Sequence, residues 1–343
     1  MVRLDTIKLS MPYDVVSSFN INDERVINTI YTQDGSSKQT IRIEGDKSFG
    51  ISSSFIKNEG REVVLNMSAK CLFDNYLESI NINTIDEALS NYNQYSPLKV
   101  DVQKAIENSR LYICDSTQMI YPNYDLNMCK DSLLVMRTNS RCDVKPYSGR
   151  NQCGIVFNSS TKKEKRRLTI YSKELDLTKA PKSHRVFLGN CSNALKIIND
   201  SKGSFRVEQN SSGRRSILKR FDIEDNTLLN VLNSSKNPNY DYLMSISKDS
   251  KQLDLFLDSY SDYSLSQLEK RVGIETICNR FDRDIELIRG FIKSKVTHRN
   301  HYRHFNKYIE VISDLEKREF LERNKISSTK INNHIFELIK TAA

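Results

Sequence analysis

Hydrophobic and polar residues alternate with a period of two along much of the first two-thirds of the chain, which is typical of half-buried β-strands. Ile7, Leu9 and Met11 alternate with Lys8 and Ser10. The same pattern predicts further strands in EVVLNMS at 62–68, RLYICDST at 110–117, CGIVFN at 153–158, RRLTIY at 166–171 and FRVEQ at 205–209. Two short runs in TIRIEGDKSFGIS, at 40–52, predict a hairpin around Gly45 and Asp46.

Helical spacing replaces this alternation from about residue 222. A first helix is already predicted near Thr84, because Thr-Ile-Asp-Glu87 is a capping-box pattern. The later helical segments are NTLLNVLNS, KQLDLFLDSY, LSQLEKRV, RDIELIRGFIKS, FNKYIEVISDLEKREFL and NNHIFELIK, between residues 226 and 340. Strands followed by helices predict an α+β domain over residues 1–221 and an α-helical domain over residues 222–343.

Length and composition indicate a globular protein. The chain has 343 residues, of which 38% are hydrophobic and 28% are charged, and this mix excludes wholesale disorder. No apolar run approaches the roughly 18–20 residues of a membrane helix, and the first residues contain no signal-peptide pattern. The seven cysteines are scattered without a C-x-x-C pair, so we expect reduced thiols and a cytoplasmic protein without a membrane partner.

The positive charge of the chain is concentrated in one segment. The formal net charge is +9, but residues 161–220 contain 16 Lys and Arg against 5 Asp and Glu, which gives this basic zone +11 and the remainder −2. Clustered cations gain free energy by releasing the counterions of a phosphate polymer. The basic zone therefore indicates a polyanion as partner, and a solvated charged face without a partner is the alternative that stays open.

One tyrosine lies within the basic zone on a predicted strand. In RRLTIYSKEL, strand alternation places Arg167, Thr169, Tyr171 and Lys173 on one face and the leucine and isoleucine between them on the core face. Tyr171 is a candidate phosphoryl acceptor: its phenol attacks a phosphodiester while Lys173 stabilises negative charge. A tyrosine that merely packs on the sheet is the alternative.

Two carboxylates are candidate metal ligands. Strand alternation places Asp115 on one face with Leu111 and Ile113, at the end of an apolar stripe, and Glu208 follows Arg206 on the polar face of FRVEQ. Carboxylates prefer hard cations such as Mg²⁺ or Mn²⁺, which polarise a phosphate. An Asp that caps a strand end and an Arg206–Glu208 surface pair are the alternatives.

Other chemistries have less support in the sequence. HRNHYRHF places three histidines at three-residue spacing among cations, which favours a basic helix over a zinc site. It contains no His-x-x-Arg motif, which argues against a tyrosine recombinase. The chain contains no G-x-x-x-x-G-K-[ST] motif either, so the sequence does not indicate a P-loop ATPase.

Taken in order, several segments resemble the replication initiators of the filamentous-phage gene II / gene X type. The similar blocks are LDTIKLSMPY, LNMSAKCLFDNYLESININTIDEAL, LYICDSTQMI, RRLTIYSKELDL with its Arg-x-x-x-Tyr-x-Lys pattern, and GSFRVEQNSSGRRSI. They follow the family order over about residues 1–220, and the helical remainder resembles the family only loosely.

The resemblance implies a rolling-circle initiator that nicks and rejoins one DNA strand at an origin, built on an RRM-like antiparallel sheet. It implies that Tyr171 takes the 5′ phosphate with Lys173 beside it, and that Asp115 and Glu208 hold Mg²⁺ or Mn²⁺. The residues expected to contact DNA are Lys70, Arg166, Arg167, Arg206, Arg214 and Arg215.

The chain departs from related nicking enzymes in having no His-hydrophobe-His pair. A non-catalytic replication or regulatory protein that only binds DNA is the second hypothesis, supported by the charge alone. RNA binding on the sheet is disfavoured, because the strands lack the closely spaced aromatic residues of an RRM. Duplex DNA, a host replication protein and a second copy of the chain all stay open as partners of the C-terminal helices.

Overall fold

A computed structural model describes residues 1–33, 36–57, 61–121, 142–146, 154–160, 165–178, 182–249, 264–296 and 300–323. The helices expected at 251–260 and 332–340 lie outside these ranges, as do Lys162, Lys163 and His298. Within the described residues, no helix combines the length and the apolar character that crossing a membrane requires.

The strands follow the predicted alternation closely. They are β1 (Leu4–Pro12), β2 (Val16–Phe19), β3 (Val26–Gln33), β4 (Ser36–Ile43), β5 (Ser54–Lys57), β6 (Glu62–Ser68), β7 (Leu98–Val100), β8 (Arg110–Ile120), β9 (Cys142–Pro146), β10 (Gly154–Ser160), β11 (Lys165–Ser172) and β12 (Phe205–Ser212). The described residues also form the 3₁₀ segments η1 (Tyr13–Val15), η2 (Lys47–Phe49) and the longer η3 (Ala69–Glu78).

Helices lie between the strands and, from α7 onward, follow them. They are α1 (Ile85–Tyr95), α2 (Val102–Asn108), α4 (Lys173–Thr178), α5 (Lys182–Gly189), α6 (Ala194–Asp200), α7 (Arg214–Phe221), α8 (Leu228–Leu232), α9 (Pro238–Asp249), α11 (Leu265–Arg280), α12 (Ile285–Lys295) and α13 (His301–Arg323). The helix expected near Thr84 forms, but the Thr84 side chain does not cap it and instead donates to the carbonyl of Ser79.

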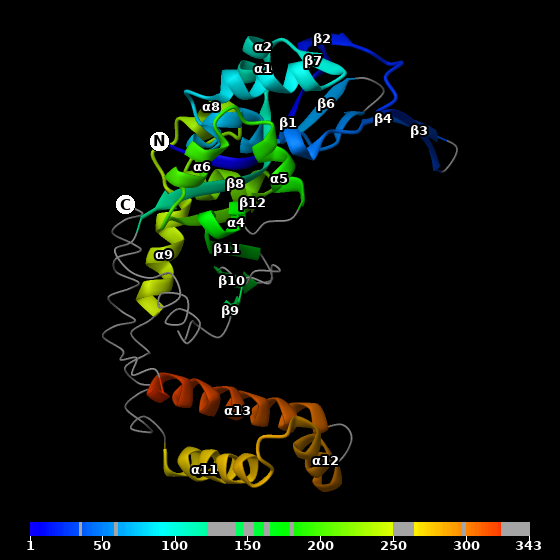
Figure 1. Ribbon diagram of the computed structural model, residues 1–343. Coiled ribbons are helices and arrows are strands. Elements are labelled where there is room, and N and C mark those ends of the chain that lie inside the picture. The colour runs from blue at the N-terminus through cyan, green and yellow to red at the C-terminus, as the bar shows by residue number, and fades with distance from the viewer. Residues whose placement is uncertain are drawn as a thin grey trace.

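Ten of the described strands form one sheet in the order β3-β4-β5-β6-β1-β8-β12-β11-β10-β9, and β2 pairs with β7 (Figure 1). Every pairing is antiparallel. α7 and α9 pack against β8 and β12, while η3 contacts α1, α5 and α6. The predicted α+β class, an antiparallel sheet with flanking helices followed by an α-helical C-terminal segment, is confirmed.

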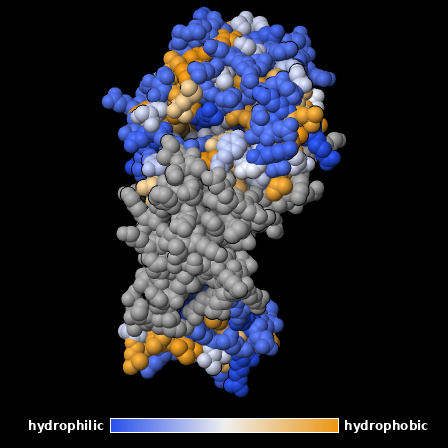
Figure 2. Space-filling model, turned by 60° about the vertical axis from the view of Figure 1, so that its left-hand side comes forward, coloured by the Kyte–Doolittle hydropathy of each residue, from blue (hydrophilic) through white to orange (hydrophobic). Residues whose placement is uncertain are grey.

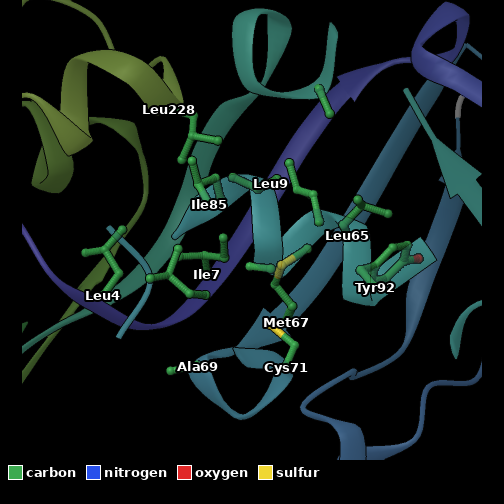
Figure 3. Packing of buried hydrophobic residues seen from close by; sticks show 14 of the residues in the cluster. Leu4, Ile7, Leu9, Leu65, Met67, Ala69, Cys71, Ile85, Tyr92 and Leu228 are labelled. Atoms are coloured by element: carbon green, nitrogen blue, oxygen red, sulfur yellow. The ribbon is translucent and has the colours of Figure 1, made fainter. Parts of the chain in front are cut away.

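The main core lies where the central strands meet α1, η3 and α8. Ile7 and Leu9 of β1 and Leu65 of β6 are fully buried and pack beside Tyr92 of α1 and Leu228 of α8 (Figure 3). Each such aliphatic side chain contributes roughly 1.5–3 kcal/mol when it leaves water. The alternation seen in the sequence therefore has its expected cause, since one residue in two of β1 and β6 faces this core.

The C-terminal helices α11, α12 and α13 have a small core of their own. Cys278, Ile288, Ile292 and Phe305 are buried there, and Ser264 begins α11 with a complete capping box. Figure 2 shows a mainly hydrophilic surface over the described residues, with hydrophobic residues in small groups on the upper part and at the lower end. Helix α8 contributes Leu228 to the main core, and the domain boundary between residues 221 and 222 stays a prediction.

Candidate functional site

Polar residues of three adjacent strands share one face of the sheet. Tyr171 of β11 pairs with Arg206 of β12, and Thr117 of β8 pairs with Glu208 of β12. Because alternate residues of a strand point to the same face, these four side chains lie together. The fold therefore places the candidate nucleophile beside one of the two acidic residues expected from the sequence.

A β-bulge in β8 decides where Asp115 points. Leu9 of β1 pairs with Leu111 and the preceding Lys8 pairs with Ile113, so Tyr112 is an extra residue of β8. An extra residue shifts the alternation by one position. Leu111 consequently faces the core, whereas Ile113 and Asp115 face the opposite side. The expectation that Leu111 shares a face with Asp115 is wrong for this reason.

A second irregularity, near the start of β1, brings another carboxylate to the site. Leu4 pairs with Ser116 and Thr6 pairs with Asp115, which leaves Asp5 as an extra residue. Its side chain forms an ion pair with Arg206. Bulges re-aim side chains in this way, and here the bulge adds a carboxylate that the regular alternation would have sent toward the core.

The phenol of Tyr171 donates a hydrogen bond to Glu208 Oε1 at 2.6 Å. Tyr171 is only 6% exposed, and burial followed by the Glu208 charge raises its pKa well above the usual value. Burial, and then Asp5, also raises the pKa of Glu208 to about 7. At neutral pH the phenol thus keeps its proton, beside a carboxylate that is poised to exchange one.

Arg206 is the centre of the ionic contacts. It is fully buried, its Nε donates to Thr117 Oγ1 at 2.8 Å and lies 3.0 Å from Glu208 Oε1, and its Nη2 binds Asp5. Its Nη1 is buried without a hydrogen bond to any described residue. Burial opposes the charge, but Asp5, Tyr76 and the other neighbours outweigh burial and raise the Arg206 pKa well above its usual value.

Lys173 reaches the site from a helix rather than from the strand. β11 ends at Ser172, and Lys173 is the first residue of α4. Its Nζ donates to Tyr76 Oη at 2.6 Å and to Asp176 Oδ2 at 2.7 Å, and it lies 5.4 Å from the Tyr171 ring centre. Burial lowers the Lys173 pKa, but Tyr76 and Asp176 outweigh burial and the net shift is upward. The amine is therefore a charged and fully buried neighbour of the phenol ring.

The η3 segment closes the site above these cations. Tyr76 contacts both Lys173 and Arg206, whose guanidinium carbon lies 5.3 Å from its ring centre. Two non-glycine residues with positive φ flank Tyr76: Phe73 at 46° and Ser79 at 59°. Such backbone strain persists only where the surrounding structure enforces it, and it clusters at functional sites.

Gly154 allows the close approach of β10 to Tyr171. It is the cross-strand partner of Tyr171, and a Cβ built on it would lie 2.2 Å from the carbonyl oxygen of Ile170 and 2.5 Å from the Tyr171 Cβ. Any side chain at this position would displace the strand that carries the phenol. Glycine is thus required here for packing rather than for a turn.

The cations expected to contact DNA occupy different environments. Arg167, Arg214 and Arg215 are exposed, and Arg166 is half-buried with its guanidinium carbon 5.9 Å from the Tyr242 ring centre. Arg206, by contrast, binds carboxylates in the interior.

Lys70 lies at the edge of the ionic network. Its Nζ is 5.7 Å from the ring centre of Phe187, and burial and then Lys173 lower its pKa. Lys173, Arg206 and Arg220 of the basic zone are all buried, so the surface charge of the zone is smaller than the sequence suggests.

The described residues do not form a dedicated metal cage. No group of three or more His, Cys, Asp and Glu among them could hold an ion. Asp115 is half-buried, accepts from Asn210 Nδ2 at 2.7 Å and has its pKa raised by burial, and Glu208 Oε1 is taken by Tyr171 and Arg206. A metal ion with Asp115 and Glu208 as ligands stays a prediction.

The sequence pointed to Tyr171, Lys173 and Glu208, and the fold brings these three together. The sequence alone did not indicate the side chains that hold these three residues, which are Asp5, Tyr76, Thr117 and Asp176. Of these four, only Asp176 could have been identified from the sequence, because it follows Lys173 by three residues and such side chains meet on one face of a helix.

No known protein family matches the chain, and no curated protein matches it. Among solved structures, it is similar to a rolling circle replication initiator protein from Geobacillus stearothermophilus, with a TM-score of 0.28 and 9% identity over 63% of this chain and 76% of that one. A TM-score this low carries no argument about fold or function, so the site has to be interpreted from its own residues.

Proposed function

We propose that this protein initiates rolling-circle DNA replication as a strand-nicking and joining enzyme, with Tyr171 as nucleophile and Glu208 as its proton acceptor. The observation that carries the proposal is the 2.6 Å hydrogen bond from the phenol to a carboxylate whose pKa is raised to about 7. A tyrosine becomes a useful nucleophile when an adjoining base accepts its proton. The raised pKa of Tyr171 makes such a base necessary.

The proposed reaction exchanges one phosphoester for another. Tyr171 Oη attacks phosphorus, the Oη–P bond forms as the P–O3′ bond breaks, and the phenol proton passes to Glu208. The departing 3′-oxygen takes up this proton from Glu208, and the carboxylate returns to its ionised form. The products are a 5′-phosphotyrosine and a free 3′-hydroxyl, and the reverse sequence rejoins the strand without ATP. Lys173 and Arg206 offset the negative charge that develops near the ring.

The phosphate would approach from the side of the two partly exposed carboxylates. The Glu208 side chain is 22% exposed and that of Asp5 is 20% exposed, whereas Lys173 and Arg206 are closed off from solvent. Protonation of Glu208 near neutral pH lowers the repulsion between this rim and a phosphodiester. Arg167, on the same face of β11 as Tyr171, is exposed and suited to contact the backbone of the strand.

Tyr171→Phe is the direct test, because it removes one oxygen and leaves the ring. On origin-bearing supercoiled DNA and on single-stranded DNA, we expect wild type to form an adduct that survives denaturation. Tyr171→Phe should lose the adduct and more than a thousandfold of the nicking rate. The matched control is Tyr112→Phe, since Tyr112 is 47% exposed on β8. An adduct that persists in Tyr171→Phe would assign the nucleophile to another residue.

Mg²⁺ or Mn²⁺ remains the predicted cofactor, and Asp115 and Glu208 remain its predicted ligands. Glu208 would bind the ion through the carboxylate oxygen that Tyr171 does not contact, which leaves Oε1 to accept the phenol proton. Mg²⁺ commonly binds through one or two carboxylates together with substrate phosphates and water, so a site completed by DNA is compatible with the absence of a three-residue group among the described residues. We expect Asp115→Ala to abolish nicking while DNA affinity stays near normal. Nicking at the wild-type rate by Asp115→Ala would remove Asp115 from the site, and nicking at that rate in the presence of a chelator would remove the metal from the proposal.

A non-catalytic DNA-binding protein is the second candidate, and a specific observation favours it. Tyr171 is nearly buried and hydrogen-bonded, as a purely structural tyrosine would be. This candidate predicts salt-dependent DNA binding with no cleavage of any single-stranded or supercoiled substrate by the wild-type protein. Covalent adduct formation by wild type would exclude it.

A further inference from the structure

A polar pocket of about 450 Å³ lies at a notch in the sheet, along the edge of β8. β1 pairs with β8 only as far as Leu4 opposite Ser116, and the last backbone hydrogen bond runs from the amide of Thr117 to the carbonyl of Arg3. Beyond this point β8 has β12 as its one described neighbour. The notch is bordered by residues 1–3, by β8 and by residues 235–239 at the start of α9.

The edge of β8 offers backbone groups to whatever fills the notch. In an antiparallel ladder, residues two apart direct their amide and carbonyl to the same neighbour. The amide of Thr117 points to β1, so those of Met119 point to the same side, where β1 has already ended. Met119 lines the pocket. A strand edge that no described strand covers is a ready template for hydrogen bonds with a polar ligand.

The side chains of the pocket suit an anion that also carries a polar planar group. Arg3 and Lys236 come from separate segments of its wall, and none of the described lining residues is acidic. Among the amide side chains, Asn237 donates to Gln118 at 2.9 Å, which fixes both in the wall. Apolar atoms of Met119 and other lining residues provide a surface for a ring. Cations for a phosphate and amides for a base edge together describe a nucleotide.

The two cations are available for such a ligand. Arg3 is 3.6 Å from Glu78 and Lys236 is 4.0 Å from Asp222, and their own side chains are 40% and 47% exposed. Exposed pairs of this length contribute little to stability, so a phosphate can replace the carboxylate partner at small cost. The volume of the pocket also lies within the usual range of small-ligand sites.

One side chain joins the pocket to the tyrosine site. Thr117 lines the pocket, accepts from Arg206 Nε at 2.8 Å and is the cross-strand partner of Glu208. Glu208 in turn accepts from Tyr171. We propose that the pocket binds a nucleotide of the DNA strand that is cleaved, within a few nucleotides of the phosphate attacked by Tyr171, with Arg3 and Lys236 at its phosphate. This inference rests on the proposed function for its place near the cleaved bond.

Binding without cleavage separates this inference from the nicking reaction, so the test uses full-length protein carrying Tyr171→Phe. The probe is a mixed-sequence single-stranded oligonucleotide, followed by fluorescence anisotropy. We expect Arg3→Glu with Lys236→Glu to weaken binding about tenfold or more. The matched control is Lys99→Glu with Lys104→Glu, two exposed lysines on β7 and α2 that make the same change of net charge. The control should weaken binding less than threefold.

Photo-crosslinking locates the bound strand. With 5-iodouracil in the same oligonucleotide, we expect crosslinked peptides from residues 1–3, 116–119 or 235–239. Equal losses in the two double variants, or crosslinks confined to other segments, would overturn the pocket even if wild type nicks through Tyr171. A matched RNA that displaces the DNA more strongly would overturn the assignment to DNA. Conversely, pocket crosslinks together with nicking by Tyr171→Phe would reject the nucleophile and retain the nucleotide site.

Discussion

Two regions of the molecule use an arginine to bridge two carboxylates, and they differ in what else the carboxylates do. In the C-terminal helices, Arg271 binds Glu275 at 2.9 Å within α11 and Asp314 at 2.9 Å on α13. In the sheet, Arg206 likewise connects carboxylates that are far apart in the sequence. Both arginines are largely buried, at 12% and 0% side-chain exposure for Arg271 and Arg206 respectively.

The sheet site differs because one of its carboxylates also accepts a hydrogen bond from a tyrosine. No buried nitrogen of Arg271 lacks a hydrogen bond, whereas Nη1 of Arg206 does. Glu208 also holds the phenol of Tyr171 and has a pKa raised to about 7. Similar ion pairs therefore occur in two settings. In the helices the arginine joins two elements, whereas in the sheet burial and Asp5 raise the pKa of Glu208 although Arg206 lowers it. Perturbed carboxylates next to a nucleophile are typical of reactive sites.

The largest expected effect is on stability, and it compares the two arginines directly. Arg206→Met leaves two carboxylates without their cation, so we expect a loss of about 3 kcal/mol in the free energy of unfolding. Arg271→Met should cost about 1–2 kcal/mol, because the Arg271 side chain is itself 12% exposed whereas that of Arg206 is fully buried. Urea unfolding measures both losses, and hydrogen exchange localises them: β8, β11 and β12 for Arg206, and α11 and α13 for Arg271.

Equal losses of unfolding free energy in Arg206→Met and Arg271→Met would contradict the proposed difference between the two arginines. So would faster exchange that spreads over the whole chain in either variant, because it would show that neither ion network acts locally. A loss below about 1 kcal/mol for Arg206→Met would mean that water replaces the guanidinium readily, and that the site is more open than its burial indicates.

The next effect is on the reaction and concerns the two glutamates. Glu208→Gln keeps the side-chain shape but cannot accept the phenol proton, so we expect nicking to fall by about 10²–10⁴-fold. Wild-type nicking should rise with pH through about 7, the pKa of Glu208, because only the ionised carboxylate accepts a proton. The variant should show no such rise. The matched control is Glu275→Gln, which changes a carboxylate that binds Arg271 in the C-terminal helices. This variant should nick at the wild-type rate.

Stability provides an independent readout of the same group. The folded-state pKa of Glu208, about 7, is above its unfolded value of 4.5, so its proton favours the folded state at low pH. That contribution is fully present below pH 4.5 and is lost as the pH rises through about 7. Over this window wild type should lose stability relative to Glu208→Gln. A constant difference between them would mean that Glu208 has an ordinary pKa.

The alternation of residues predicted most strands, because burying one side of a sheet imposes a period of two. It failed where single residues break the register. The bulge at Tyr112 reverses the face of Leu111 relative to Asp115, and the one at Asp5 brings an unexpected carboxylate to the site. A bulge leaves no mark in residue type here, so it becomes visible only when the pairing of β1 with β8 is known.

Only part of the candidate site could be predicted from the sequence, because the rest depends on how neighbouring elements are arranged. Tyr171 and Glu208 lie on strands with clean alternation, whereas Lys173 reaches the phenol only because a helix begins where β11 ends. Counting charge along the chain also treated Arg206 as a surface cation, although it is fully buried. Charge counts cannot separate cations that pair inside the fold from those that face solvent, since that depends on partners distant in sequence.

The smallest expected effect concerns cations that belong to neither network. Arg214 and Arg215 are exposed in the first turn of α7, where the helix dipole disfavours positive charge, so they add nothing to the stability of that helix. We expect Arg214→Ala with Arg215→Ala to reduce the salt dependence of DNA binding by about two phosphate contacts and affinity by roughly tenfold. Nicking at saturating DNA should stay at the wild-type rate. Because both residues lie outside the ion networks, the urea midpoint should not fall. Titrations at several salt concentrations measure the slope, and an unchanged slope would place the DNA on another face and leave these arginines as solvated charge.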